Sequence, residues 1–431
     1  MAKLKDRIFL ACRLVALTVA TISVPHLTHA DILSLEDAIK RATIHSPDIQ
    51  VLVAQKKSAG LKAAQALAPT EPTIALTLQD MNTPVHGING QASRAFTFTQ
   101  PFAFPGKAFL AQSALEYQAK AVGAQLRAME LTISTSVRTA FYQLAIAREN
   151  LRLNAEQRLF YERILAIAKR RYEAGAITQV DLLNAEIALH ANDNDTSDLH
   201  SVEHTAAIQL NTIMGQPSEE ALDLGRLKFD RKPAVEFSKL EDRMLGGRQE
   251  LKVALFQEQA SEKTFHLALM SWLPDFQVSA GTTFYDIETA SPINASPGGG
   301  AHSYFVGLQM TLPIWFVFDQ RLTMKGAASD LRSATANSHL LLQQSRLALE
   351  TAVDSFKTSE AKIANFEAHI LPLTEQSLNL AIINYGAGKI DFQTLADTAT
   401  ARRVNRQNYL STVTAYYNAY TTIGQLIGED L

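Results

Sequence analysis

Two long stretches of the chain carry helical patterning with almost no interruption, and their length limits the fold more than any other feature. The first runs from about Lys107 to Tyr172 without a proline, and the second runs from about Asp319 to Tyr385 with only Pro372. Each spans roughly 66 residues, which at 1.5 Å per residue gives a rod of about 100 Å, whereas globular helices average about 11 residues. Rods of this length are typical of coiled coils.

Apolar and small residues recur every seven positions along both rods, as in Ile133, Ala140 and Ala147 of the first and Leu349 and Phe356 of the second. This spacing predicts a coiled-coil seam. An ordinary amphipathic core stripe would explain the spacing equally well, but it would not explain the length of the rods. Alanine and serine fill many places between, which indicates that each helix has close neighbours on both sides. The second rod is expected to bend at its proline, which removes a backbone donor and clashes with the preceding turn.

A different pattern precedes each rod, because apolar residues there alternate with small or polar ones. Ile74, Leu76 and Leu78 show it most clearly. A period of two predicts β-strands. We expect four of them, with turn-rich loops at 81–92 and 286–302; the strands are placed at 73–79, 95–99, 276–284 and 305–312.

The second half of the chain repeats the first. One shift places Tyr172 on Tyr385 and Gly175 on Gly388, and the same shift places Met214-Gly215 on Ile427-Gly428. Because one shift aligns two separated features, duplication is favoured over a chance similarity between alanine-rich helices. The chain then divides into a first repeat at 31–215, an irregular insert at 216–247 and a second repeat at 248–431.

The first thirty residues have the three parts of a secretory signal peptide. Lys3, Lys5 and Arg7 form a basic start, an apolar run covers 14–24, and 28–30 offers a small-residue cleavage site. The only cysteine lies inside this segment, so the mature chain is expected to have no disulfide and no thiolate metal site. Its destination is outside the cytoplasm.

Several functional classes are excluded or disfavoured by composition and motifs. The formal net charge is −3 and no Lys/Arg cluster is present, which argues against nucleic-acid binding. After residue 30 no run of 18 apolar residues would span a membrane as a helix. The chain has no nucleophile elbow, metalloprotease motif or glycine fingerprint, so we expect neither an enzyme nor a bound cofactor.

Four strands cannot bury both faces of a water-soluble sandwich, and no other strand candidates remain. Apolar-out, small-polar-in alternation in a secreted chain fits a transmembrane β-barrel. Such a barrel must close and needs at least about eight strands, so several chains would share it. The residues expected to face lipid are Phe96, Phe98, Phe276 and Val306.

The chain contains the same order of elements twice: a helix, two strands, a long rod, a glycine turn and a returning helix. This order resembles that of the TolC-like outer membrane factor family. The resemblance spans the mature chain and includes the opening SLEDAIKRATIHSPDIQ, the strand exit FTQPFAFPGK and the two tyrosine–glycine turns. It implies a mainly α fold with a small β part. Three chains with four strands each would form a twelve-stranded barrel in the outer membrane, continued by a helical tube across the periplasm.

The resemblance also implies a function and partners. The protein would be the passive outer-membrane exit duct of a tripartite efflux or type I secretion system, with a periplasmic adaptor and an inner-membrane transporter. The insert 216–247 and the C-terminal residues would form an equatorial band. FTQPFAFPGKAFL is closest to the heavy-metal efflux branch but lacks the arginine that often follows, and metal cations, drugs and polypeptides all remain open as cargo. The alternative is an elongated periplasmic adaptor without a pore, which would lack the four strands.

The two glycine turns would lie at the periplasmic tip, where Gly175 and Gly388 adopt positive φ to reverse the chain. Three carboxylates follow the turns: Asp181, Asp391 and Asp397. One interpretation is that they only stabilise helix starts through the helix dipole. The other is that they form acidic rings at a narrow gate, and the resemblance supports this for Asp181 and Asp397. Like charges this close repel each other, so we expect Lys389, next to Gly388, to hold them together through the neighbouring repeat. The resemblance gives no clear partner in the second turn, because Ile390 lies where some family members carry arginine.

His200 and His204 lie four residues apart on an expected helix, among several acidic residues. This spacing suits a divalent metal, but no third ligand is placed at comparable spacing. A solvated helix face is the favoured interpretation.

Overall fold

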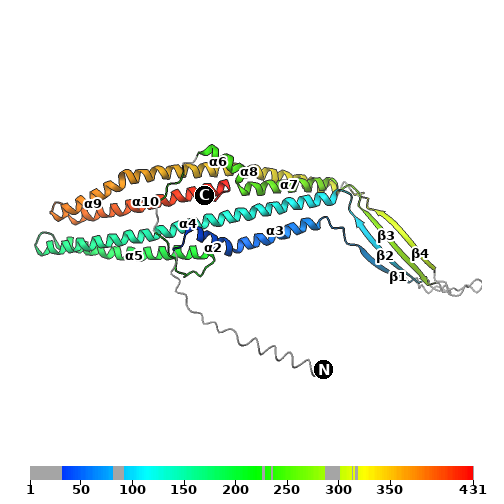
Figure 1. The fold of residues 1–431 in the computed structure, drawn as a ribbon, viewed down its shortest axis with the longest axis horizontal. Coiled ribbons are helices and arrows are strands. Elements are labelled where there is room, and N and C mark those ends of the chain that lie inside the picture. The colour runs from blue at the N-terminus through cyan, green and yellow to red at the C-terminus, as the bar shows by residue number, and fades with distance from the viewer. Residues whose placement is uncertain are drawn as a thin grey trace, which may run out of the picture.

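The computed structural model describes residues 32–80, 92–225, 229–233, 236–286, 301–312, 314–315 and 319–430. The molecule is elongated, with long helices running away from a small sheet at one end (Figure 1). The first half contains α2 (Leu35–His45), α3 (Pro47–Gln65), β1 (Thr73–Asp80), β2 (Ala92–Phe102), α4 (Lys107–Glu173) and α5 (Gln179–Met214). The second contains α6 (Phe237–Gly247), α7 (Gln249–Leu269), β3 (Phe276–Asp286), β4 (Ala301–Met310), α8 (Gln320–Asn365), the π-helix η1 (Phe366–Ile370), α9 (Leu371–Gly386) and α10 (Phe392–Ile427). Within the described ranges, no helix combines the length and apolar character needed to span a membrane.

The two predicted rods are present. The first is the single helix α4, of 67 residues. The second is divided into α8 of 46 residues, η1 of 5 residues and α9 of 16 residues. Pro372 lies in the first turn of α9, where it cannot donate a backbone bond and would clash with the carbonyl of Ala368 in a regular helix. The wider π turn just before it relieves that clash, so the expected disruption takes this form.

The internal repeat is confirmed in the backbone. Gly175 and Gly388 have φ of 66° and 72°, and Gly215 and Gly428 have φ of 70° and 78°. At Gly175 and Gly388, the glycine N–H donates to the carbonyl of the tyrosine three residues earlier, at 2.9 and 3.0 Å. The N–H of the residue after each glycine donates to the carbonyl five residues before it, at 2.8 Å in both turns. This double bond pattern is the Schellman motif, which needs a left-handed residue and so favours glycine. The exact division at 215 and 247 stays a prediction.

The four strands form one antiparallel sheet in the order β1-β2-β3-β4. Its register places Ile74 opposite Phe98, Phe98 opposite Ala280, and Ala280 opposite Val306. Directly opposed residues share a face of the sheet. The four residues expected to face lipid therefore lie on one face, namely Phe96, Phe98, Phe276 and Val306.

Two of the four strands have bounds that differ from the predicted ones, and the loops cannot be compared. β2 spans Ala92–Phe102, whereas the alternating pattern placed it at 95–99. β4 begins at Ala301 and ends at Met310, whereas the alternating pattern placed it at 305–312. The pattern missed the beginning because His302 and Ser303 give no apolar signal, although both pair with β3. The expected loops at 81–92 and 286–302 lie almost wholly outside the described residues.

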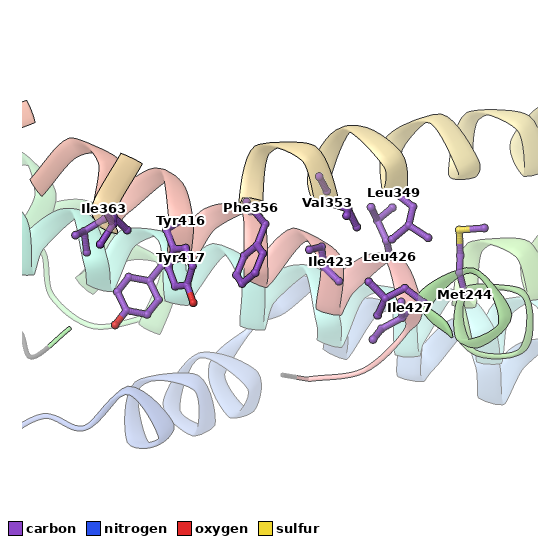
Figure 2. Packing of buried hydrophobic residues seen from close by; sticks show 14 residues of the cluster. Met244, Leu349, Val353, Phe356, Ile363, Tyr416, Tyr417, Ile423, Leu426 and Ile427 are labelled. Carbon is purple, nitrogen blue, oxygen red and sulfur yellow. The ribbon is translucent and has the colours of Figure 1, made fainter. Parts of the chain in front are cut away.

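Buried residues form three clusters along the helices. One joins α2, α4 and α5, a second joins α6, α8 and α10, and a third joins α4 and α5 to α9 and α10. In the second cluster Phe356 stacks on Tyr416 with centroids 4.6 Å apart, and Figure 2 shows both between α8 and α10. The hydroxyls of Tyr416 and Tyr417 accept backbone bonds from Lys232 at 2.7 Å and Asp230 at 2.8 Å, which fixes the insert to α10.

We predict that Phe356→Ala lowers the free energy of unfolding by about 3–5 kcal/mol, because it removes a fully buried ring and leaves a cavity. Denaturant unfolding of the detergent-purified protein measures this. The neighbouring exposed Lys357→Ala is the control and should change stability by about 0.5 kcal/mol or less. Equal effects of the two substitutions would contradict the importance of this cluster.

Candidate functional site

One face of the sheet exposes large apolar side chains on all four strands. Val306 is 83% exposed and Leu308 is 74% exposed; Phe96 and Phe98 are also exposed, while Phe276 is half-buried beside Phe104. The opposite face carries mostly small and polar residues, with Phe305 as an exception. Soluble monomers rarely expose apolar surfaces of this extent, which mark contacts with proteins or membranes.

The sheet is also open at both edges. Within the described chain, β1 pairs only with β2 and β4 pairs only with β3. The outer edges of β1 and β4 therefore present backbone N–H and C=O groups that need partners, and lipid cannot supply them. One chain alone does not complete this surface.

The corner between sheet and helices is built on Asp275. Its Oδ1 accepts from the Phe104 backbone N–H at 2.8 Å and from the Lys107 ammonium at 2.9 Å, and Lys107 also bonds the Leu273 carbonyl at 2.8 Å. These bonds tie the β2–α4 corner to the α7–β3 corner. Lys107 is the lysine of the Pro-Gly-Lys motif that the sequence analysis noted without assigning it a contact.

Both tryptophans of the chain lie near this corner. Trp272 follows α7 and Trp315 follows β4, and both side chains are exposed. Tryptophan is enriched at membrane–water interfaces, where its apolar ring and polar N–H suit the headgroup region.

At the opposite end of the molecule, the turns after α4 and α9 lie together (Figure 1). They line one open cleft of about 670 Å³. The cleft brings together most of the predicted tip residues and one further cation: Gly175, Asp181, Gly388, Lys389, Asp391 and Arg171. Asp397 lies farther along α10, where it accepts a bond from Gln393 at 2.8 Å.

Two of the tip carboxylates cap helices. Asp181 and Thr178 form a capping box, in which the Asp181 carboxylate accepts from the Thr178 N–H at 3.1 Å and the Asp181 N–H bonds the threonine hydroxyl at 3.2 Å. Asp391 accepts from the Thr394 N–H at 2.8 Å at the start of α10. Hydrogen bonding from Thr394 lowers the pKa of the Asp391 carboxyl. The helix-start interpretation therefore has a structural basis for both residues.

The residue expected to hold these carboxylates does not do so inside one chain. Among the described residues, no ion pair joins Lys389 to Asp181 or Asp397. A contact of Lys389 with a carboxylate of the neighbouring repeat stays a prediction for the assembled protein.

Arg171 makes the cross-half contact that the sequence analysis missed. It belongs to the last turn of α4, and its Nη1 donates to the Tyr385 carbonyl at the end of α9. Its guanidinium also lies 5.1 Å from the centre of the Tyr385 ring. Tyr385 is 1% exposed, whereas its repeat partner Tyr172 is 42% exposed. The sequence offered one indication of this contact, because the first repeat has Arg171 where the second repeat has Asn384.

Both histidines of the predicted pair are exposed on α5. The Nε2 of His204 lies 3.1 Å from the carboxylate of Glu219, and His200 is exposed. No group of three His, Cys, Asp or Glu suited to a metal occurs in the part of the chain that the structure describes.

The sequence matches the family model for outer membrane efflux proteins over residues 38–216 and 240–429. The chain belongs to this family. Protein CyaE of Bordetella pertussis is 26% identical over 344 residues, covering 76% of this chain and 69% of the relative. The cobalt-zinc-cadmium resistance protein CzcC of Cupriavidus metallidurans is 25% identical over 352 residues, covering 76% of this chain and 75% of the relative.

A solved structure shares the fold. The outer-membrane channel OprN superimposes with a TM-score of 0.78 at 17% identity, covering 91% of this chain and 89% of that chain. The resemblance seen in the sequence and the mainly α fold are thereby confirmed, and the protein is an outer-membrane efflux component. The alternative of a strand-free adaptor is wrong, since the chain forms four strands and matches this family.

We predict that Asp391→Ala frays the first turn of α10, because the carboxylate caps its N-terminus. Hydrogen exchange at residues 393–395 should become faster at neutral pH. The lowered pKa means that the cap persists at neutral pH and is lost only when the pH falls through that lowered value. Asp397→Ala, which removes no cap, should leave exchange in this turn unchanged, and equal effects would refute the assignment.

Proposed function

We propose that the protein is a homotrimeric exit duct, in which three chains close a β-barrel in the outer membrane and a helical tube below it in the periplasm. The observation that supports this proposal most directly is the sheet, which combines an exposed apolar face with two open edges. A sheet in lipid must close on itself, and a four-stranded sheet is too small to do so alone. Two chains would supply eight strands and three would supply twelve, and the family resemblance favours three.

The internal repeat supports a ring of chains. Within one chain, α4 of the first half packs against α10 of the second half. The equivalent contact would join α8 and α9 to α5 of the next chain. Leu373 and Leu380 of α9 are 62% and 60% exposed, although their repeat partners Phe160 and Ile167 pack against the tip cluster. A neighbouring first half would cover these two leucines.

Tip residues would then be repeated around the axis of the duct. Asp181 and Asp397 would form acidic rings at the periplasmic entrance, while Asp391 and Lys389 would lie beside them in the cleft between the turns. Capping bonds do not remove the negative charge of Asp181, so the helix-start role and the ring role are compatible.

We infer that a periplasmic adaptor and an inner-membrane transporter complete the machine and that the duct itself is passive. The names of the relatives refer to different cargo. CzcC and NccC are named as metal resistance proteins and OpmQ as a pyoverdine export protein, and each is 24–25% identical to this chain over the aligned residues. Because similar ducts serve different cargo, selection is assigned to the inner-membrane partner.

The decisive experiment measures the mass of the detergent-purified complex. We predict a trimer, and we predict that Phe96→Arg disrupts it, because a charge on the lipid face costs roughly 2–4 kcal/mol near the bilayer midplane. The matched control is Thr97→Arg, one residue along the same strand and on the other face, which should leave the trimer intact. A stable monomer, or equal disruption by both substitutions, would overturn the proposal.

A second prediction concerns the acidic rings. Replacing Asp181 and Asp397 with Ala together should reduce cation selectivity in planar bilayers, because the rings attract cations over the ~8–10 Å Debye length. High salt should weaken the selectivity of the unmodified channel in the same direction. If the double variant keeps its selectivity and only loses thermal stability, the residues act as helix-start residues alone.

A further inference from the structure

We propose that Phe305 is a contact site for uncharged, planar aromatic solutes on the inner wall of the β-barrel. The inference rests on the proposed function, because this face of the sheet lines a passage only when the sheets of several chains close into one barrel. It deepens that function by naming a class of cargo for which the exit has a binding surface. Phe305 lies in the middle of β4, on the face of the sheet opposite the exposed apolar face.

The strand register places Phe305 in a row of small residues. Directly opposed residues share a face of the sheet, and the row across the four strands consists of Ala75, Thr97, Gly281 and Phe305. β4 is an edge strand, so in the proposed barrel β1 of the next chain would lie on the other side of the ring, with its small side chains on this face. Phe305 is therefore a single large apolar side chain among small neighbours.

Gly281 allows the ring to lie close to the backbone of the sheet. A Cβ at this position would lie 2.7 Å from both Cε1 and Cζ of Phe305 and 2.5 Å from the carbonyl oxygen of Phe96, so only glycine fits. The ring extends over this glycine and remains 39% exposed. Covering a strand glycine with an aromatic ring also stabilises a sheet, and the experiment has to separate this structural role from contact with cargo.

The rest of this face is uncharged. Apart from Phe305, its described side chains belong to threonine, serine, alanine, glutamine, proline and glycine, as at Thr77, Thr283, Ser303 and Gln309. Within the described strands, this face therefore has neither the carboxylates nor the imidazoles that commonly hold divalent cations. It also has no charge that would attract or repel an ion passing along it.

An exposed ring on an uncharged wall suits a flat, uncharged organic molecule. Aromatic rings attract each other in offset-stacked or edge-to-face arrangements, beyond the gain from the buried area alone. A hydrated metal cation finds no ligand on such a wall, so the contact favours aromatic cargo over metal cations. Selection by the inner-membrane partner is unaffected, because Phe305 acts on cargo that is already inside the duct.

The test uses the absence of cysteine after residue 30, which makes an introduced thiol unique in the mature chain. Ser303→Cys places that thiol two residues from Phe305 on the same face, and Val306→Cys places it on the opposite face. In liposomes, a charged, water-soluble thiol reagent should modify Ser303→Cys and not Val306→Cys. Caffeine, which is planar, aromatic and uncharged, should slow the modification of Ser303→Cys, whereas sucrose, which is uncharged but not aromatic, should not.

Substitutions of Phe305 in the Ser303→Cys protein then assign the protection to the ring. The caffeine concentration that halves the modification rate should rise about twofold to tenfold in Phe305→Ala, the range expected for one lost aromatic contact. Phe305→Tyr keeps the ring and should retain the protection. Phe305→Leu still covers Gly281 with an apolar side chain but has no ring, so it should lose the protection even where the alanine variant fails to assemble.

Two kinds of negative result are distinguishable. Equal protection by caffeine in the phenylalanine and leucine proteins, or equal protection by sucrose and caffeine, would overturn the contact site and leave Phe305 only as a cover for the glycine. An unreactive thiol at Ser303→Cys, or equal reaction of the thiols on both faces, would instead show that this face does not line a water-filled passage and would overturn the proposed function.

Discussion

Closure of the sheet is the constraint on which the rest of the molecule depends. Backbone groups in lipid must find partners within protein, and four strands with two open edges leave a row of such groups on each side. In the proposed barrel the apolar face then turns outward and the small, polar face inward. In the proposed ring each chain would also pass its rods out on the same side, and the bonds of Asp275 to Phe104 and Lys107 hold the corner from which they leave the sheet.

The two repeats have similar folds, and the residues at which they differ indicate where the two halves of the chain have different roles. The first rod is continuous, whereas the second has the π turn before Pro372. The first turn exposes its tyrosine and the second buries it beneath Arg171. The family match spans both halves, yet these particular residues break the internal symmetry.

The sequence alone was sufficient for features that depend on local periodicity. Heptad spacing predicted both rods to within a residue or two, alternation predicted four strands, and the paired glycines predicted the turns with positive φ. It was insufficient for features that depend on which surfaces meet. The reach of Arg171 to the Tyr385 carbonyl spans two halves, and no local pattern encodes it. Likewise, Pro372 predicted a disruption but not a π turn, because the neighbouring helices determine how the clash is relieved.

The π turn is also one of the points at which the insert contacts the second rod. Glu367 of η1 accepts from Arg231 of the insert at 2.7 Å and from the Tyr409 hydroxyl of α10 at 2.9 Å. Burial and the neighbouring carboxylate raise the pKa of Tyr409, so its hydroxyl remains a donor over the whole physiological range. Any displacement of the tip must therefore break these contacts or originate in the 16 residues of α9 below them.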